Sequence, residues 1–197
     1  MALKKNIATI TEDEYLAGED ISVTKHEFIG GEIFSMLGAS KNHERISGNV
    51  FVNLHAHLQN SRCEPFSSDV KVKVGDDFFY PDAMVVCDDQ TEHDYYTETP
   101  TIIVEVFSKS TRRYDATIKR TAYQSTPSLQ EYILIEQDFV DVEVSRKKDQ
   151  WRSRHYLLGE SLTLESIGLT INVEDLYQRV KNDDMREFII NRDTPAG

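Results

Sequence analysis

The chain has 197 residues and a formal net charge of -12, from 22 Lys and Arg against 34 Asp and Glu. This length predicts one compact domain, and a hydrophobic fraction of 39% is typical of an ordinary globular protein rather than a disordered one. The acidic balance excludes a protein that coats nucleic acid or anionic membranes by bulk electrostatics. Any role on nucleic acid is therefore expected to be local and catalytic.

Domain organisation is expected to be simple, because no repeat or linker composition interrupts the chain. Residues 1–180 are expected to form a single domain, with 181–197 as a C-terminal tail or a last, fraying helix. The N-terminus lacks the apolar run of a signal peptide, and no window approaches about 18 apolar residues. The sequence therefore predicts a cytoplasmic protein without membrane contact.

The two cysteines, Cys63 and Cys87, have no metal-ligand spacing, and two thiols are too few for a disulfide scaffold. Both are therefore expected to be reduced and buried.

The predicted elements begin with a short helix and a hairpin. Thr11 and Glu14 form a capping-box pattern, which opens a helix through Leu16. Residues 27–34 hold two β-prone runs around Gly30-Gly31, which is typical of a tight hairpin.

The rest of the chain alternates between helical and strand patterns. An amphipathic helix is predicted by apolar residues that recur every four positions, namely Ile46, Val50, Leu54 and Leu58. A second helix is predicted over 115–124, and it ends before Pro127. The expected strands are 69–74, 83–87, 102–107 and 131–135, followed by a hairpin of 140–145 and 151–158. This order predicts an α/β (α+β) fold with a mixed sheet.

Two acidic residues stand out within the strand patterns. Asp82 follows Pro81 just before one strand, and Glu105 lies 23 positions later inside an apolar run. A lone buried carboxylate is costly unless it is paired or binds a cation. Two strand carboxylates that converge form a hard oxygen site suited to magnesium or manganese. The alternative for Glu105 is a basic partner or a solvated sheet edge.

The helix after the Glu105 strand carries a further set of polar residues. Asp115, Lys119 and Tyr123 fall at positions i, i+4 and i+8, which places them on one helical face. Taken alone, this spacing favours a surface ion pair.

Together these motifs resemble a known nuclease pattern. Pro81-Asp82, Glu105-Val106-Phe107, Ser108 to Thr111 and Asp115-x3-Lys119-x3-Tyr123 resemble the PD-(D/E)xK restriction-endonuclease-like superfamily and, more narrowly, its Uma-type endonuclease family. The resemblance covers residues 10–180. It implies a restriction-endonuclease-like mixed central β-sheet flanked by helices, with an N-terminal β-hairpin.

The resemblance also implies a site. Asp82 and Glu105 would hold Mg2+ or Mn2+, helped by the carbonyl of Val106. Lys119 would be a migrated catalytic lysine, because Phe107 stands where the superfamily carries Lys. Possible cleft-lining residues are Glu27, His43, Asp115 and Tyr123. For Glu27 a solvated strand position, and for His43 a polar helix N-terminus, stay open as alternatives.

Basic residues around this site are candidates for binding nucleic acid. They are Lys109, Arg112, Arg113 and Arg120. For both basic groups the alternative is a solvated face of an acidic protein. This alternative is favoured for the second group, which consists of Arg146, Lys147, Lys148, Arg152 and Arg154.

The resulting hypothesis is metal-dependent hydrolysis of phosphodiester bonds, with DNA as the expected substrate and a homodimer as the implied assembly. Structured RNA or short single strands stay open as substrates, because no stacking motif separates them. The alternative is a catalytically silent nuclease-fold module that binds a protein or nucleic-acid partner. It is motivated by Phe107 in place of the lysine and by the net charge.

Overall fold

The computed structural model describes residues 10–36, 38–91, 93–107 and 115–193. The helices are α1 (Glu12–Glu19), α2 (Lys41–Leu58), α4 (Arg120–Ser125), α5 (Val173–Leu176) and α6 (Asp183–Asp193), with a π-helical turn η1 (Asp115–Lys119) and a 3-10 turn η2 (Lys147–Asp149). The strands are β1 (His26–Ile29), β2 (Glu32–Ser35), β3 (Cys63–Ser67), β4 (Lys71–Val74), β5 (Asp77–Phe79), β6 (Ala83–Cys87), β7 (Tyr96–Thr97), β8 (Pro100–Phe107), β9 (Glu131–Glu136), β10 (Val142–Arg146), β11 (Ser153–Tyr156), β12 (Ser161–Leu164) and β13 (Leu169–Asn172).

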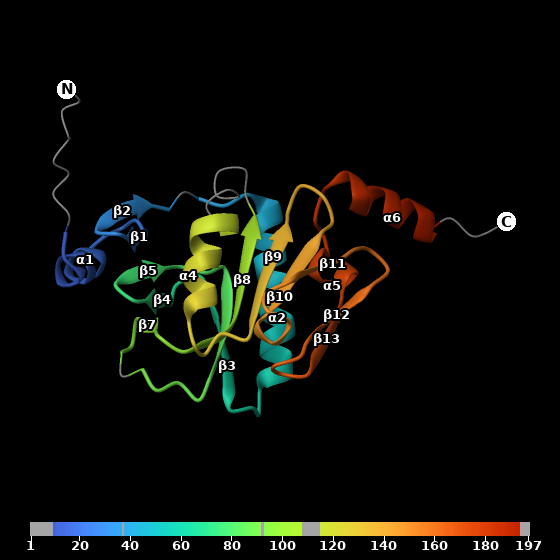
Figure 1. Cartoon of the computed structure of the whole chain (residues 1–197). Coiled ribbons are helices and arrows are strands. Elements are labelled where there is room, and N and C mark those ends of the chain that lie inside the picture. Colours follow the sequence, from blue (N-terminus) through green and yellow to red (C-terminus); the bar gives the residue numbers. More distant parts are fainter. Residues whose placement is uncertain (1–9, 37, 92, 108–114, 194–197) are drawn as a thin grey trace, which may run out of the picture.

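A six-stranded sheet in the order β11-β10-β9-β8-β6-β3 forms the centre of the molecule. It is mixed, because β8 and β9 are parallel while β6 and β8 are antiparallel. A parallel pair needs a crossover connection, and here it runs through η1 and α4. A smaller sheet, β2-β1-β5-β4-β7, lies toward the N-terminus (Figure 1). This confirms the predicted mixed sheet with flanking helices and an N-terminal hairpin.

The two faces of the central sheet are covered by different elements (Figure 1). The four apolar positions of α2, at residues 46, 50, 54 and 58, pack with Val104 and Val106 on one face. On the other face Tyr123 of α4 packs with Ile103 and Phe107. Glu105 alternates with these strand residues, so its side chain lies on the same face as Phe107 and Tyr123.

The N-terminal predictions are confirmed. The side chain of Thr11 accepts a hydrogen bond from the Glu14 amide, and the Glu14 carboxylate accepts one from the Thr11 amide, so both halves of the capping box are present. Strands β1 and β2 meet at Gly30 and Gly31, whose φ values of 58° and 82° lie in the left-handed region that glycine adopts without strain.

The predicted helix over 115–124 is only partly correct. Its first turn, η1, is π-helical, and α-helical geometry begins at Arg120. A π-helical turn has a wider hydrogen-bond step than an α-helix, and such turns occur frequently at functional sites. Lys119 and Tyr123 nevertheless both contact Oε1 of Glu105, so these two side chains share one face as the sequence predicts, while the side chain of Asp115 lies outside the described residues.

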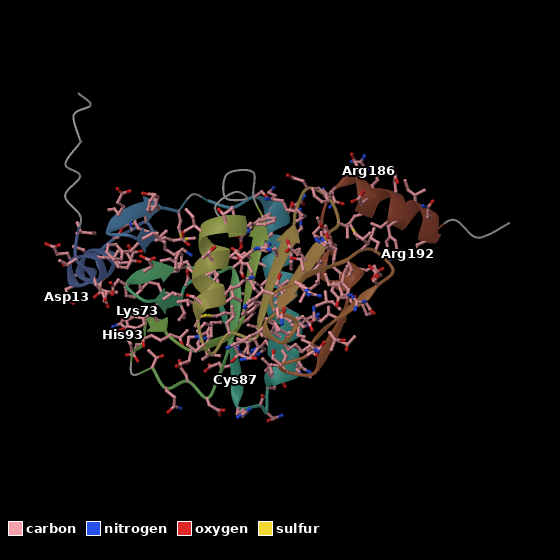
Figure 2. The ribbon with its side chains drawn as sticks, in the orientation of Figure 1. Asp13, Lys73, Cys87, His93, Arg186 and Arg192 are labelled. Atoms are coloured by element: carbon pink, nitrogen blue, oxygen red, sulfur yellow. A yellow bond between two sulfur atoms is a disulfide. The ribbon has the colours of Figure 1, made fainter. Side chains whose placement is uncertain are left out.

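The expectation of two reduced cysteines is wrong in this structure, because Cys63 and Cys87 form a disulfide. They face each other in the register of β3 and β6, and that neighbour relationship cannot be deduced from their spacing in sequence. Cys63 is buried and Cys87 is half-buried. The bond lies at the lower end of the sheet, where Cys87 is labelled in Figure 2.

The C-terminal part closes one side of the core. The hairpin β12–β13 and α5 contribute apolar side chains to the cluster around α2, among them Leu162, Ile171 and Leu176. Residues 183–193 form the helix α6, and Met185 in its first turn is buried in the same cluster. In the part of the chain that is described, no helix is both long and apolar enough to cross a membrane.

Candidate active site at the end of β8

Asp82 and Glu105 are brought together by the pairing of β6 with β8. Ala83 is opposite Val104 in this antiparallel pair, so extending the register by one residue places Asp82 opposite Glu105. The Val106 amide donates a hydrogen bond of 2.7 Å to Oδ2 of Asp82. Two acidic residues that are far apart in sequence are therefore neighbours across the β6–β8 pair, beside the C-terminal end of β8.

Lys119 reaches this point from η1. Its Nζ atom lies 3.1 Å from Oε1 of Glu105 and 2.8 Å from Oε1 of Glu27. The side chain of Lys119 is only 5% exposed, so its ammonium group is held between two carboxylates away from bulk water. Phe107 is packed in the apolar cluster around Tyr123, which leaves η1 as the element that supplies the lysine.

Glu27 enters the site from the small sheet. Strand β1 pairs with β5 through Phe28 and Phe78, and β5 leads directly into Tyr80, Pro81 and Asp82. The Tyr80 amide donates to Oε1 of Glu27 over 3.1 Å. Glu27 is therefore buried and paired, and it is not the solvated strand carboxylate that the sequence left open.

His43 lies on the outer side of Asp82. Its Nε2 atom is 3.2 Å from Oδ2 of Asp82, and the two side chains are 13% and 15% exposed. Glu105 and Lys119 are buried more deeply, at 4% and 5%. Asp82 and His43 therefore form the accessible edge of the cluster.

The N-terminus of α2 is fixed to the end of β8. Ser40 caps the helix by accepting a hydrogen bond of 3.1 Å from the His43 amide, and its hydroxyl also contacts the Gln137 side chain. The side chain of Gln137 in turn donates a hydrogen bond of 2.7 Å to the carbonyl of Phe107. These contacts hold the first turn of α2, and with it His43, beside Asp82.

Tyr123 lies behind Glu105 and is fully buried, so it does not line an accessible surface. Its hydroxyl donates a hydrogen bond of 3.2 Å to Oε1 of Glu105. Burial, with the nearby carboxylates of Glu105 and Glu27, raises the pKa of Tyr123 well above its ordinary value. The phenol therefore stays protonated and remains a donor to Glu105.

The charge of the cluster favours a bound cation. Three carboxylates, from Glu27, Asp82 and Glu105, face one lysine ammonium and one imidazole. Within the described ranges, no group of three His, Cys, Asp or Glu is arranged to hold a metal ion. Magnesium does not require such a cage, because it is commonly bound by one or two carboxylates together with water and substrate phosphates. The donor set of Asp82 and Glu105 therefore fits magnesium or manganese.

In the described part of the chain, the other predicted site residues form no hydrogen bond or ion pair with the side chains of Asp82, Glu105 or Lys119. The backbone of Asp115 begins η1, but its side chain lies outside the described part, as do Lys109, Arg112 and Arg113. Arg120 forms an ion pair of 2.8 Å with Glu143, so a nucleic-acid contact by Arg120 would compete with this pair.

The second basic group is largely committed to contacts within the protein. Arg146 is buried against Glu131, Lys147 contacts the carbonyl of Pro127, and Lys148 pairs with Glu165. A polar pocket of about 570 Å³ adjoins this group near Thr101 and Gln130, at the opposite end of the sheet. Asp82, Glu105 and Lys119 do not line it.

The chain is similar to several known proteins. A family model described as "Uma2: Putative restriction endonuclease" matches residues 13–174. The chain belongs to the Uma2 family. Two uncharacterized proteins of Synechocystis sp. are similar: slr1290 is 35% identical over 175 residues (86% of this chain, 92% of the relative), and sll1609 is 36% identical over 163 residues (79% and 92%).

A solved structure shares the fold. It is the crystal structure of "a putative nuclease belonging to DUF820" from Anabaena variabilis, with a TM-score of 0.73 and 19% identity. The similarity covers 87% of this chain and 99% of the other. The nuclease-like architecture expected from the motifs is therefore confirmed for the fold.

Proposed function

We propose that this Uma2 family member is a divalent-metal-dependent endonuclease that hydrolyses phosphodiester bonds in DNA. The observation that carries the proposal is the meeting of Asp82, Glu105 and Lys119 at the end of β8. The family description supports the reaction class, and the net negative charge of the cluster supports a cation.

Asp82 and Glu105 would hold Mg2+ or Mn2+, with the carbonyl of Val106 as a further oxygen ligand. When bound, such an ion lowers the pKa of a water ligand and polarises a phosphoryl oxygen. The Val106 amide and His43 both contact Oδ2 of Asp82, which leaves fewer rotamers for this carboxylate.

Lys119 has the charge and the position to act on the attacking water or on the phosphate. Its ammonium group stands beside Glu105, where it would orient the attacking water or stabilise negative charge that develops on the phosphate. Burial strengthens this electrostatic interaction, because water screens it less.

The remaining expectations belong to the same proposal. Lys109, Arg112 and Arg113 would contact the nucleic-acid backbone next to the site, since the protein as a whole is acidic. Action as a homodimer and a cytoplasmic location are also proposed, and sedimentation at several concentrations tests the first of these.

The test is cleavage of supercoiled plasmid with Mg2+ or Mn2+. We expect the parent protein to nick or linearise the plasmid only with the metal, and Asp82→Asn and Lys119→Met to be slower by about 100-fold. Asp141→Asn is a matched control, because Asp141 also pairs with a histidine, His155, at the edge of the sheet.

Cleavage by Asp82→Asn at the parent rate would contradict the proposed reaction. Structured RNA and single-stranded DNA are tested beside the plasmid. Cleavage of RNA without cleavage of DNA would support phosphodiester hydrolysis but contradict DNA as the substrate.

A further inference from the structure

The contacts of Glu27 give it a function distinct from that of the two carboxylates proposed to bind metal. Its Oε1 atom accepts from Lys119 Nζ at 2.8 Å and from the Tyr80 amide at 3.1 Å. One oxygen thus joins two segments: the π-helical turn that carries Lys119 and the loop that continues into Asp82.

The Nζ atom of Lys119 lies 2.8 Å from Oε1 of Glu27 and 3.1 Å from Oε1 of Glu105, so the contact with Glu27 is the shorter one. A cation at Glu105 would repel the ammonium group and weaken its pairing with Glu105. Glu27 then remains as a carboxylate partner that keeps Lys119 in place. A charge-assisted hydrogen bond of this kind is strong and directional when it is buried.

We propose that Glu27 is the positioning residue of Lys119, so that the N-terminal hairpin holds the lysine that the strand motif lacks. This inference rests on the proposed nuclease function for its consequence, but the positioning itself is a property of the protein alone. Glu27 acts through Lys119 and does not itself bind the metal.

The chain offers a matched control. Glu131 is also buried, and its Oε1 atom accepts from a cation, Arg146 Nε at 3.0 Å, and from a backbone amide, Glu165 N at 3.1 Å. This pair lies at the opposite end of the central sheet. Glu131→Gln therefore reproduces the loss of a buried paired carboxylate without touching Lys119.

The first arm measures Lys119 directly in the full chain, by reductive methylation of lysines and mass spectrometry. In Glu27→Gln we expect Lys119 to be modified about tenfold faster than in the parent, as loss of one charge-assisted hydrogen bond allows. Glu131→Gln should leave this rate unchanged. An unchanged rate in Glu27→Gln overturns the proposal, even if the parent has no nuclease activity.

The second arm measures cleavage at saturating Mn2+. We expect Glu27→Gln to be slower by about tenfold or more, because a misplaced catalytic group costs that much. In a Lys119→Met background, the same change should have almost no further effect. A full additional loss in that background would show that Glu27 does not act through Lys119.

The third arm is calorimetric titration of Mn2+. We expect Glu27→Gln to retain binding within about tenfold of the parent. Complete loss of binding would make Glu27 a ligand and overturn the positioning role. If Glu27→Gln does not fold, Glu27→Asp is used instead, because it keeps the charge but withdraws it from Lys119.

Discussion

The phenol of Tyr123 and the carboxylate of Glu105 are joined by a buried hydrogen bond of 3.2 Å to Oε1, the same oxygen that Lys119 contacts at 3.1 Å. Two donors on one oxygen restrict the rotation of the carboxylate. Tyr123 is itself held by Phe79, which meets it edge to face, and by Tyr132. Glu105 is therefore oriented by a rigid aromatic layer.

Tyr123→Phe is expected to loosen Glu105 while keeping the packing of the ring. Outer groups that orient a metal ligand typically contribute about tenfold or more to affinity, so Mn2+ should bind about tenfold more weakly. The free energy of unfolding should fall by about 1.5 kcal/mol, as for a hydrogen bond to a charged group. Titration calorimetry and urea denaturation measure the two effects.

Tyr156→Phe serves as the control for this change. Tyr156 is also buried, and its hydroxyl accepts a hydrogen bond of 3.4 Å from Arg146, beside the pair of Arg146 with Glu131 at the opposite end of the central sheet. We expect it to lower stability without changing the affinity for Mn2+. Equal affinities in Tyr123→Phe and the parent would show that the phenol does not orient the ligand.

Alkaline pH is expected to destabilise the fold. Burial raises the pKa of four tyrosines above their ordinary value of 10.0, namely Tyr15, Tyr80, Tyr123 and Tyr177. Above about pH 10 the unfolded chain releases these protons while the folded chain retains them, so stability is complete below that pH and falls as pH rises. Burial lowers the pKa of Lys71, and this shift opposes the trend.

Urea midpoints measured from about pH 8 to about pH 11 test this expectation. Tyrosinate absorbance should rise together with unfolding. Ionisation of all nine tyrosines near pH 10 in a protein that remains folded would contradict it.

The cysteine pair gives a prediction that is independent of any activity. Protein purified without reductant should show no free thiol after denaturation, and reduction should release two. The bond joins residues separated by 24 positions, so its loss should lower the free energy of unfolding by about 3 kcal/mol. Detection of two free thiols without reductant would contradict the pairing of Cys63 with Cys87.

Local sequence patterns predict the helices, turns and strands whose conformation is set by their own residues rather than by the distant segments they pack against. The four-residue spacing from Ile46 to Leu58 is enough for α2, because an amphipathic stripe is decided within one helix. The Gly30-Gly31 turn is decided by backbone freedom at two neighbouring residues. The buried run around Glu105 likewise predicts β8 from its own residues.

Contacts between distant segments are not visible in such patterns. The pairing of Glu27 with Lys119 depends on β1 lying beside β5, and the disulfide depends on β3 lying beside β6. The π-helical turn at Asp115–Lys119 has no signal in residue spacing. The family resemblance makes Glu27 a candidate cleft residue, but its position in a β-prone run is also typical of a solvated strand, and its pairing with Lys119 is visible only in the structure.

A metal site at Asp82 and Glu105 is tested by calorimetric titration of Mn2+ into the parent protein and into Asp82→Asn and Glu105→Gln. We expect one saturable binding event in the parent that each substitution weakens by about 100-fold, while Asp141→Asn leaves it unchanged. Absence of Mn2+ binding by the parent, or equal binding by all four proteins, would contradict a metal site at Asp82 and Glu105.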